Sequence, residues 1–504
     1  MTLAKAALLG TARTSDLPAT GTPVDALIEQ RGDLSHERRL LLAAGAFAIY
    51  RRAGYTPRSS DDLPIDVAPS ESRPACSAGA AAVLRDMLAE FRYELLSEAF
   101  TGIDRVGWRV PPTLLVDVLD LEEVSLREAA RPVLGERGRW LAGKRAAWAW
   151  ARGIPEQPPI DDLRRVWDEG RFEERAAAIQ LLRQIDPDRA REWIAEGWKT
   201  ETSDARLTLV AVLANRLSDA DEEWLVSVSR DRTRAVRAAI VSLLARLPRS
   251  STPARLTERA DSMLDWKSGL VVVPPTEFDP AWEADGLVAR PPKGVGERAH
   301  WLVQALSLVR PGHWAERFRQ PPIAVARASI ATDWAVPVME GLTRAALLHD
   351  AQEWLVTLWD VWLESPAPAD PQSAATTRDM LLLLFTHMSG AEAEARVGRL
   401  IDSAARFDID LEAALDRFGV PWSDRVGQRV LEAIEAGATN PGSPLAAHLP
   451  ALFRAAGPGL PAPLLERAVA LSTGPAVLAR ALRAFDLFAR QVFLRARLYQ
   501  ELPR

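Results

Sequence analysis

Residues 231–248 read Asp-Arg-Thr-Arg-Ala-Val-Arg-Ala-Ala-Ile-Val-Ser-Leu-Leu-Ala-Arg-Leu-Pro. Within this stretch, apolar side chains recur three and four positions apart, which is the spacing of one face of an α-helix. The closing proline cannot continue a helix, because it lacks the backbone N–H and its ring clashes with the preceding turn. The stretch therefore predicts one amphipathic helix between residues 233 and 247.

The same pattern recurs earlier in the chain with a period of 31 residues. Glu-Trp-Ile at 192–194 is matched by Glu-Trp-Leu at 223–225. The same offset, taken in both directions, aligns one leucine in each copy, namely Leu182, Leu213 and Leu244. Residues 160–250 are therefore predicted to hold three copies of a unit made of a helix, a turn and a second helix.

One arginine recurs near the start of each predicted second helix, at Arg175, Arg206 and Arg237. A single amphipathic helix pair cannot bury its own apolar face, so neighbouring pairs must stack into an α-solenoid. The repeated arginine is predicted to pair with an acid in the turn of the neighbouring unit and to fix the stacking angle. The alternative is a ladder of arginines that lines a groove for a ligand.

Helical spacing dominates the rest of the chain, and β-branched runs with period two are almost absent. One short extended segment is predicted at 269–273, where Gly-Leu-Val-Val-Val precedes two prolines. The fold class is therefore predicted to be all-α, an elongated solenoid with a Pro-rich, partly extended insertion. The predicted regions are 1–110 (helical), 111–250 (helical, ending in the repeats), 251–299 (Pro-rich linker or insertion), 300–440 (helical) and 441–504 (a C-terminal helical cap).

Composition excludes several classes of protein. The chain has 504 residues, a formal net charge of −6 and a single cysteine, Cys76. An internal disulfide and a four-thiolate zinc site are therefore impossible, and the acidic balance disfavours a generally basic nucleic-acid binder. The longest apolar run, Leu40 to Tyr50, has 11 residues, against the ~20 that cross a bilayer. We expect a cytoplasmic protein.

The stretch at 231–248 is similar to the second helix of HEAT-like repeats. Further stretches, taken in order, resemble an uncharacterised bacterial family, a domain of unknown function with HEAT-like helices: Ala-Leu-Leu-Gly-Thr (7–11), Cys-Ser (76–77), Gly-Glu-Arg-Gly-Arg-Trp-Leu-Ala (135–142), Arg-Leu-Pro-Arg-Ser (246–250) and Gly-Val-Gly-Glu-Arg-Ala-His-Trp-Leu (294–302). Genes of that family tend to lie beside those for a MoxR-type AAA ATPase, a von Willebrand A domain protein and a SWIM zinc-finger protein. The resemblance implies protein partners of these classes and no catalytic residue.

No cofactor site is predicted. Residues 138–144 have the glycine and lysine spacing of a P-loop, but Arg145 stands where Ser or Thr would bind magnesium, and no buried strand precedes the loop. Gly294-Val295-Gly296 begins like a dinucleotide-binding fingerprint but lacks the third glycine. Both stretches are interpreted as helix boundaries or turns.

No metal site or catalytic residue is predicted either. His313 with Glu316, and His349 with Glu353, have helical spacing, but each pair lacks a third ligand. These histidines are predicted to make bonds between helices. Cys76 precedes a predicted helix, where Ser77 is expected to cap the helix and the thiol to be half-buried.

The last predicted helix, at 476–498, combines an apolar face with four arginines on another face. These arginines are Arg480, Arg483, Arg490 and Arg497. The helix is interpreted as a cap of the solenoid with a solvated basic face. The alternative is that this face binds an acidic partner or phosphates.

These patterns favour a protein-interaction scaffold or adaptor, and the resemblance implies that it works with a MoxR-type AAA ATPase and a von Willebrand A module. One alternative is a solenoid that binds nucleic acid. The other is an enzyme whose site is assembled from scattered residues at 300–440.

Overall fold

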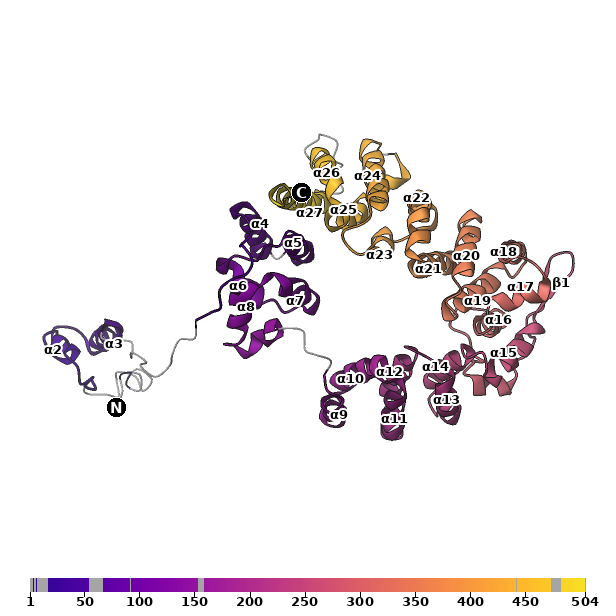
Figure 1. The fold of residues 1–504 in the computed structure, drawn as a ribbon, viewed down its shortest axis with the longest axis horizontal. Coiled ribbons are helices and arrows are strands. Elements are labelled where there is room, and N and C mark those ends of the chain that lie inside the picture. Colours follow the sequence, from indigo (N-terminus) through magenta and orange to yellow (C-terminus); the bar gives the residue numbers. More distant parts are fainter. Residues whose placement is uncertain are drawn as a thin grey trace. The chain divides into compact units, whose positions relative to one another are not determined.

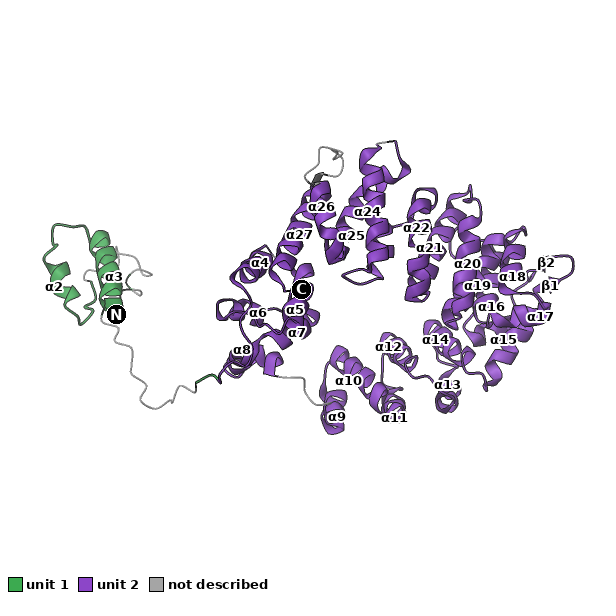
Figure 2. Ribbon diagram, turned by 45° about the horizontal axis from the view of Figure 1, so that its top comes forward, with its two compact units in different colours: residues 1–68 green, residues 69–504 purple. Residues whose placement is uncertain are grey.

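The chain separates into two compact units, residues 1–68 and 69–504 (Figure 2). Each unit is described by itself. The computed structural model describes residues 3, 6, 17–53, 67–90, 92–152, 158–440, 442–472 and 482–503. The stretch at 7–11 and Arg480, both singled out from the sequence, lie outside these residues.

Unit 1 contains a short helix, α2 (Val24–Glu29), and a long one, α3 (His36–Ala53). The two helices pack against each other through a small apolar cluster of Val24, Ile28 and Ala43. In α3, the side chains of Leu40 and Ala43 are buried. The described part of unit 1 therefore has a small apolar core.

Unit 2 is all-α, as predicted, and its described residues include one β-hairpin. Strands β1 (Leu264–Trp266) and β2 (Leu270–Val272) pair antiparallel, so the predicted extended segment at 269–273 contains β2. The stretch predicted as a linker nevertheless begins with a helix, α15 (Ser251–Asp261). Pro253 does not prevent this helix, because it lies in the first turn, where the missing N–H is not needed.

The first half of unit 2 consists of short helices and 3₁₀ turns. Its α-helices before α15 are α4 (Ala78–Ala89), α5 (Tyr93–Arg105), α6 (Leu115–Leu119), α7 (Val124–Ala130), α8 (Gly135–Ala142), α9 (Ile160–Glu169), α10 (Phe172–Ile185), α11 (Pro187–Gly197), α12 (Ser203–Leu213), α13 (Glu222–Val228) and α14 (Arg234–Ala245). Its 3₁₀ helices are η2 (Pro112–Leu114), η3 (Arg131–Val133), η4 (Ala146–Arg152) and η5 (Asp219–Asp221).

Six helices, α9 to α14, lie where the sequence predicts three units of two helices each. The second helices α10, α12 and α14 contact one another in series, and α10 also contacts α9 and α11. The leucine that the 31-residue offset aligns is buried in each of them: Leu182, Leu213 and Leu244. Helix starts follow from local sequence: Thr202 accepts a hydrogen bond from the N–H of Ala205, and Asp186 from that of Arg189.

The second half of unit 2 shares one large apolar core. Three tryptophans, Trp314, Trp359 and Trp362, are completely buried in it. Its α-helices are α16 (Glu297–Ser307), α17 (Gly312–Phe318), α18 (Pro322–Ile330), α19 (Ala335–Leu348), α20 (Gln352–Glu364), α21 (Pro371–His387), α22 (Gly390–Phe407), α23 (Leu411–Asp416), α24 (Asp424–Thr439), α25 (Leu449–Gly459), α26 (Leu465–Ser472) and α27 (Leu482–Glu501). Its 3₁₀ helices are η6 (Pro280–Asp285), η7 (Pro444–His448) and η8 (Ala462–Leu464).

The last helix, α27, joins the two ends of unit 2. It packs on α25 and α26 and also on α4 and α5, which are about 400 residues away in sequence (Figure 1). Leu494, Leu498 and Leu502 complete the apolar core that helices α4 to α8 build. The sequence separates 1–110 from 441–504, whereas the structure places residues 69–504 in one unit. None of the helices in the described ranges is both long and apolar enough to cross a membrane.

Candidate functional site

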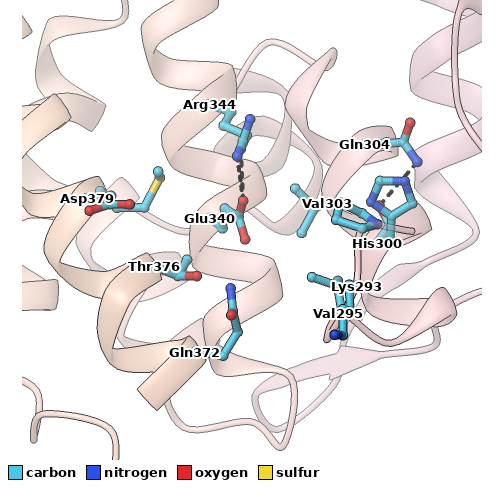
Figure 3. Close-up of a pocket in the computed structure, with 12 residues that line it drawn as sticks. Lys293, Val295, His300, Val303, Gln304, Glu340, Arg344, Gln372, Thr376 and Asp379 are labelled. Atoms are coloured by element: carbon cyan, nitrogen blue, oxygen red, sulfur yellow. Dashed lines mark hydrogen bonds and ion pairs between the residues drawn. The ribbon is translucent and has the colours of Figure 1, made fainter. Parts of the chain in front are cut away.

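A polar pocket of about 450 Å3 lies between helices α16, α19 and α21 of unit 2 (Figure 3). Helix α16 contacts α19, and α19 contacts α21, so the three helices line one recess. Lys293 and Val295, from the turn before α16, close one side. This volume lies within the range of pockets that hold small molecules.

His300, on the first turn of α16, lines this pocket and can donate or accept a hydrogen bond. Its Nε2 atom is buried and has no hydrogen-bond partner in the protein. Burial lowers the pKa of His300, while the charges of Glu340 and Arg344 act in opposite directions. The imidazole is therefore neutral at pH 7 and can exchange a hydrogen bond with a polar ligand.

An ion pair on α19 faces the same space. Arg344 donates from Nη2 to Oε1 of Glu340 at 2.7 Å and from Nε to the same atom at 3.0 Å. On the α21 side, Asp379 and Thr376 line the pocket, as Figure 3 shows. Because the two cations and two anions of the lining balance, the pocket suits a neutral or zwitterionic ligand better than a multiply charged one.

The polar residues that line this pocket form no recognisable motif in the sequence. Glu340 and Arg344 have the helical spacing of an ion pair, which is a common surface pattern. His300 appeared there only within the stretch at 294–302. No sequence signal links α16 with α21, because each of these helices packs on α19 and their arrangement depends on tertiary structure.

The predicted stacking arginines Arg175 and Arg206 each pair with an acid of the following unit. Arg175 is ion-paired to Glu201, in the turn before α12. Arg206 donates from Nη1 to Oδ2 of Asp231, in the turn before α14, at 2.7 Å. Both arginines therefore link one second helix to the start of the next.

Each of these two guanidinium groups also lies over a tryptophan. Arg175 lies 4.6 Å from the ring centre of Trp167, and Arg206 lies 5.7 Å from that of Trp198. Arg237, at the third position, bonds instead to backbone carbonyl oxygens of its own turn and of η6. The third unit is followed by α15 and the β-hairpin and not by a fourth unit. Arg237 therefore meets backbone carbonyl oxygens where Arg175 and Arg206 meet acidic side chains.

Of the C-terminal arginines singled out from the sequence, the structure describes Arg483, Arg490 and Arg497, and the last two bind acids within the chain. Arg490 donates from Nε to Oε2 of Glu90 at 3.0 Å, and this bond lowers the pKa of the Glu90 carboxyl. Arg497 donates to Asp86 at 3.3 Å. Both acids belong to α4 or its C-cap, so these arginines hold α27 against α4. Arg483 is exposed.

The two stretches that resemble nucleotide-binding motifs lie within a helix or at the start of one. Residues 138–142 lie within α8, and the ammonium group of Lys144 lies 4.9 Å from the ring centre of Trp140. Gly296 is the N-cap of α16, and Gly294 has a φ of +88°. Neither stretch follows a strand, which is the context that both motifs require.

The other histidines that the sequence singled out bond to neighbouring segments. His313 Nε2 lies 2.6 Å from Oδ1 of Asp261 on α15, and His349 Nε2 lies 3.3 Å from a backbone oxygen at the end of α16. Within the described residues, no group of three histidine, cysteine or acidic side chains could hold a metal ion.

Ser77 caps α4 by accepting a hydrogen bond from the N–H of Ala80, as predicted. The adjacent Cys76 is more deeply buried than expected, with 7% of its surface exposed. Burial raises the pKa of the Cys76 thiol, which keeps it protonated at neutral pH.

The fold and its pocket define an all-α protein of consecutively packed helices with a polar recess. The model of the family of unknown function DUF5691 matches residues 2–502. The chain therefore belongs to this family. No curated protein and no solved structure matches the chain.

Proposed function

We propose that the chain is a non-catalytic, cytoplasmic protein-interaction scaffold or adaptor, built as an elongated HEAT-like α-solenoid with a Pro-rich insertion. The observation that supports it most directly is the linkage of successive helix pairs through Arg175–Glu201 and Arg206–Asp231. Contacts of this kind fix the angle between units and keep an extended surface in one shape. Such surfaces are what repeat proteins use to bind partners.

The partners that we propose are a MoxR-type AAA ATPase and a von Willebrand A domain protein. They are implied by the resemblance given above. The exposed Arg483 on α27 is the C-terminal arginine best placed to meet an acidic partner, since Arg490 and Arg497 are already paired.

A binding experiment with purified proteins tests this proposal. We expect the full chain to bind at least one of these two proposed partners, in a saturable way at about 150 mM salt. The Arg483→Glu variant should bind several-fold more weakly, mainly through slower association. The matched control is Arg425→Glu, the same charge change at an exposed arginine of α24. Failure of both partners to bind, together with tight, salt-sensitive binding of duplex DNA, would favour the nucleic-acid alternative.

A second candidate function is small-molecule binding or catalysis in the pocket of α16, α19 and α21. The unpartnered Nε2 atom of His300 is the observation that favours it. A ligand that bonds to this atom should raise the midpoint of thermal unfolding. In a screen of neutral and zwitterionic metabolites, we expect at least one hit that disappears in His300→Leu. The hit should persist in the control Arg327→Ala, an exposed residue of α18. Hits that survive His300→Leu would count against this function.

A further inference from the structure

Helix α3 of unit 1 carries several exposed apolar side chains on one face. Sixteen large hydrophobic side chains are exposed in the described residues, and five of them lie on α2 and α3. The two most exposed on α3 are Leu41 (73%) and Ile49 (70%). Exposed apolar surface concentrated in this way marks an interaction site.

These side chains share one side of the helix. At 100° per residue, Leu41, Leu42, Gly45, Ala48 and Ile49 fall within one face, which we call the α3 apolar face. The buried Leu40 and Ala43 point to the opposite side. The side of α3 that carries Leu40 and Ala43 therefore packs inside unit 1, and the α3 apolar face is exposed.

Small residues in the middle of the α3 apolar face leave room for a second helix to pack against it. Gly45 and Ala48 are small and exposed, and a Cβ atom added at Gly45 would meet no atom within 4 Å. Small residues between larger ones allow a second helix to approach to about 8 Å between axes. A membrane surface would gain more from bulky side chains at these central positions.

The charges at the ends of the α3 apolar face indicate what kind of partner helix it can bind. Arg38 and Arg52 lie at the two ends of the α3 apolar face, 14 residues apart, or roughly 21 Å along the axis. Neither forms an ion pair with any acid that the structure describes. The helix has four arginines and one acid, Glu37. A second copy of α3, in either direction, would set arginine against arginine at both ends.

We propose that the α3 apolar face binds a helix of a different protein, with an apolar stripe bounded by acidic side chains about 14 residues apart. This inference rests on the proposed scaffold function and names the chemistry of one partner. The acids pair with Arg38 and Arg52, and the stripe covers Leu41 and Ile49.

Two synthetic 20-residue helical peptides test the proposal with the full chain. Both carry the same Leu/Ala stripe; one has glutamates 14 positions apart at its ends, and the other has lysines there. By fluorescence anisotropy, we expect the glutamate peptide to bind about tenfold or more tightly than the lysine peptide, with a difference that shrinks at high salt.

Variants of the chain make the test specific. Arg38→Glu with Arg52→Glu should reverse the preference between the peptides, which also shows that the variant is folded. Leu41→Ser with Ile49→Ser should weaken both peptides about tenfold or more. The control Arg31→Glu, an exposed arginine before α3, should change neither.

Four results would overturn the proposal. These are equal binding of the two peptides, a dimer of the chain that Leu41→Ser with Ile49→Ser dissolves, tighter binding to phosphatidylglycerol vesicles than to the glutamate peptide, and no binding of either peptide. If the ATPase or von Willebrand A protein still binds while the glutamate peptide does not, this inference fails and the scaffold function stands.

Discussion

Replacing Arg183 with methionine is expected to lower the free energy of unfolding by about 3–5 kcal/mol. Arg183 is completely buried in α10 and donates from both terminal nitrogens to the buried carboxylate of Asp221, at 2.6 and 3.0 Å. It also donates to the backbone oxygens of Asn215 and Pro187. Its loss removes two hydrogen bonds from the buried carboxylate of Asp221, which keeps only those from Arg191 and from the N–H of Ser218, and leaves several carbonyl oxygens without their donor.

Chemical denaturation, with hydrogen exchange of helices α10 to α13, measures this effect. The matched control is Arg164→Met, which breaks an exposed pair with Glu196 between α9 and α11 and should cost about 0–1 kcal/mol. Arg183→Met combined with Asp221→Leu should regain part of the loss, because the buried carboxylate is then gone and Arg191 keeps its ion pair with Asp188. A loss in Arg183→Met no larger than in Arg164→Met would contradict the prediction.

The loss of stability in Arg183→Met should also depend on pH. Burial acts to raise the pKa of Asp221, but hydrogen bonds, foremost from Arg183, outweigh it and the pKa is lowered. Without Arg183 the folded-state pKa is higher, so the variant takes up a proton at a higher pH than the wild type. Protonation removes the charge of Asp221, which without Arg183 is paired only with Arg191, so the difference in stability between variant and wild type should narrow as pH falls from 7 toward 4.

Replacing Arg495 with methionine is the second change with a large expected effect, again about 3–5 kcal/mol. Arg495 of α27 is completely buried and donates to both carboxylate oxygens of Glu98 on α5, at 2.5 and 2.8 Å. It also donates to the backbone oxygen of Gly457 at 2.8 Å. Tyr499 donates to the same carboxylate at 2.7 Å.

This effect should appear first in helices α4 and α5, because α27 is the element that holds them to α25. Hydrogen exchange over residues 78–105 should accelerate in Arg495→Met more than exchange in α16 to α21. The control is Arg497→Met, which breaks the more exposed contact with Asp86 and should cost about 0–1 kcal/mol. Unchanged exchange in α4 and α5 would show that these helices do not depend on α27.

Local patterns were predicted well and long-range contacts were not. The period of 31 residues located the helices α9 to α14, since Leu182, Leu213 and Leu244 report a burial that repeats with sequence. The start of α15 was missed, because a proline in a first turn looks the same in sequence as a proline in a linker. The pocket was missed because His300 and Asp379 belong to helices that no periodicity connects.

The sequence by itself determined the all-α class, the helix spacing and the position of the arginines, because these depend on residues three to four, or 31, positions apart. Only the tertiary structure decided what those arginines do. Arg490 and Arg497 read as a solvated basic face, yet they pair with Glu90 and Asp86. An arginine's partner is set by whichever acid the fold brings within reach, and here that acid lies about 400 residues away.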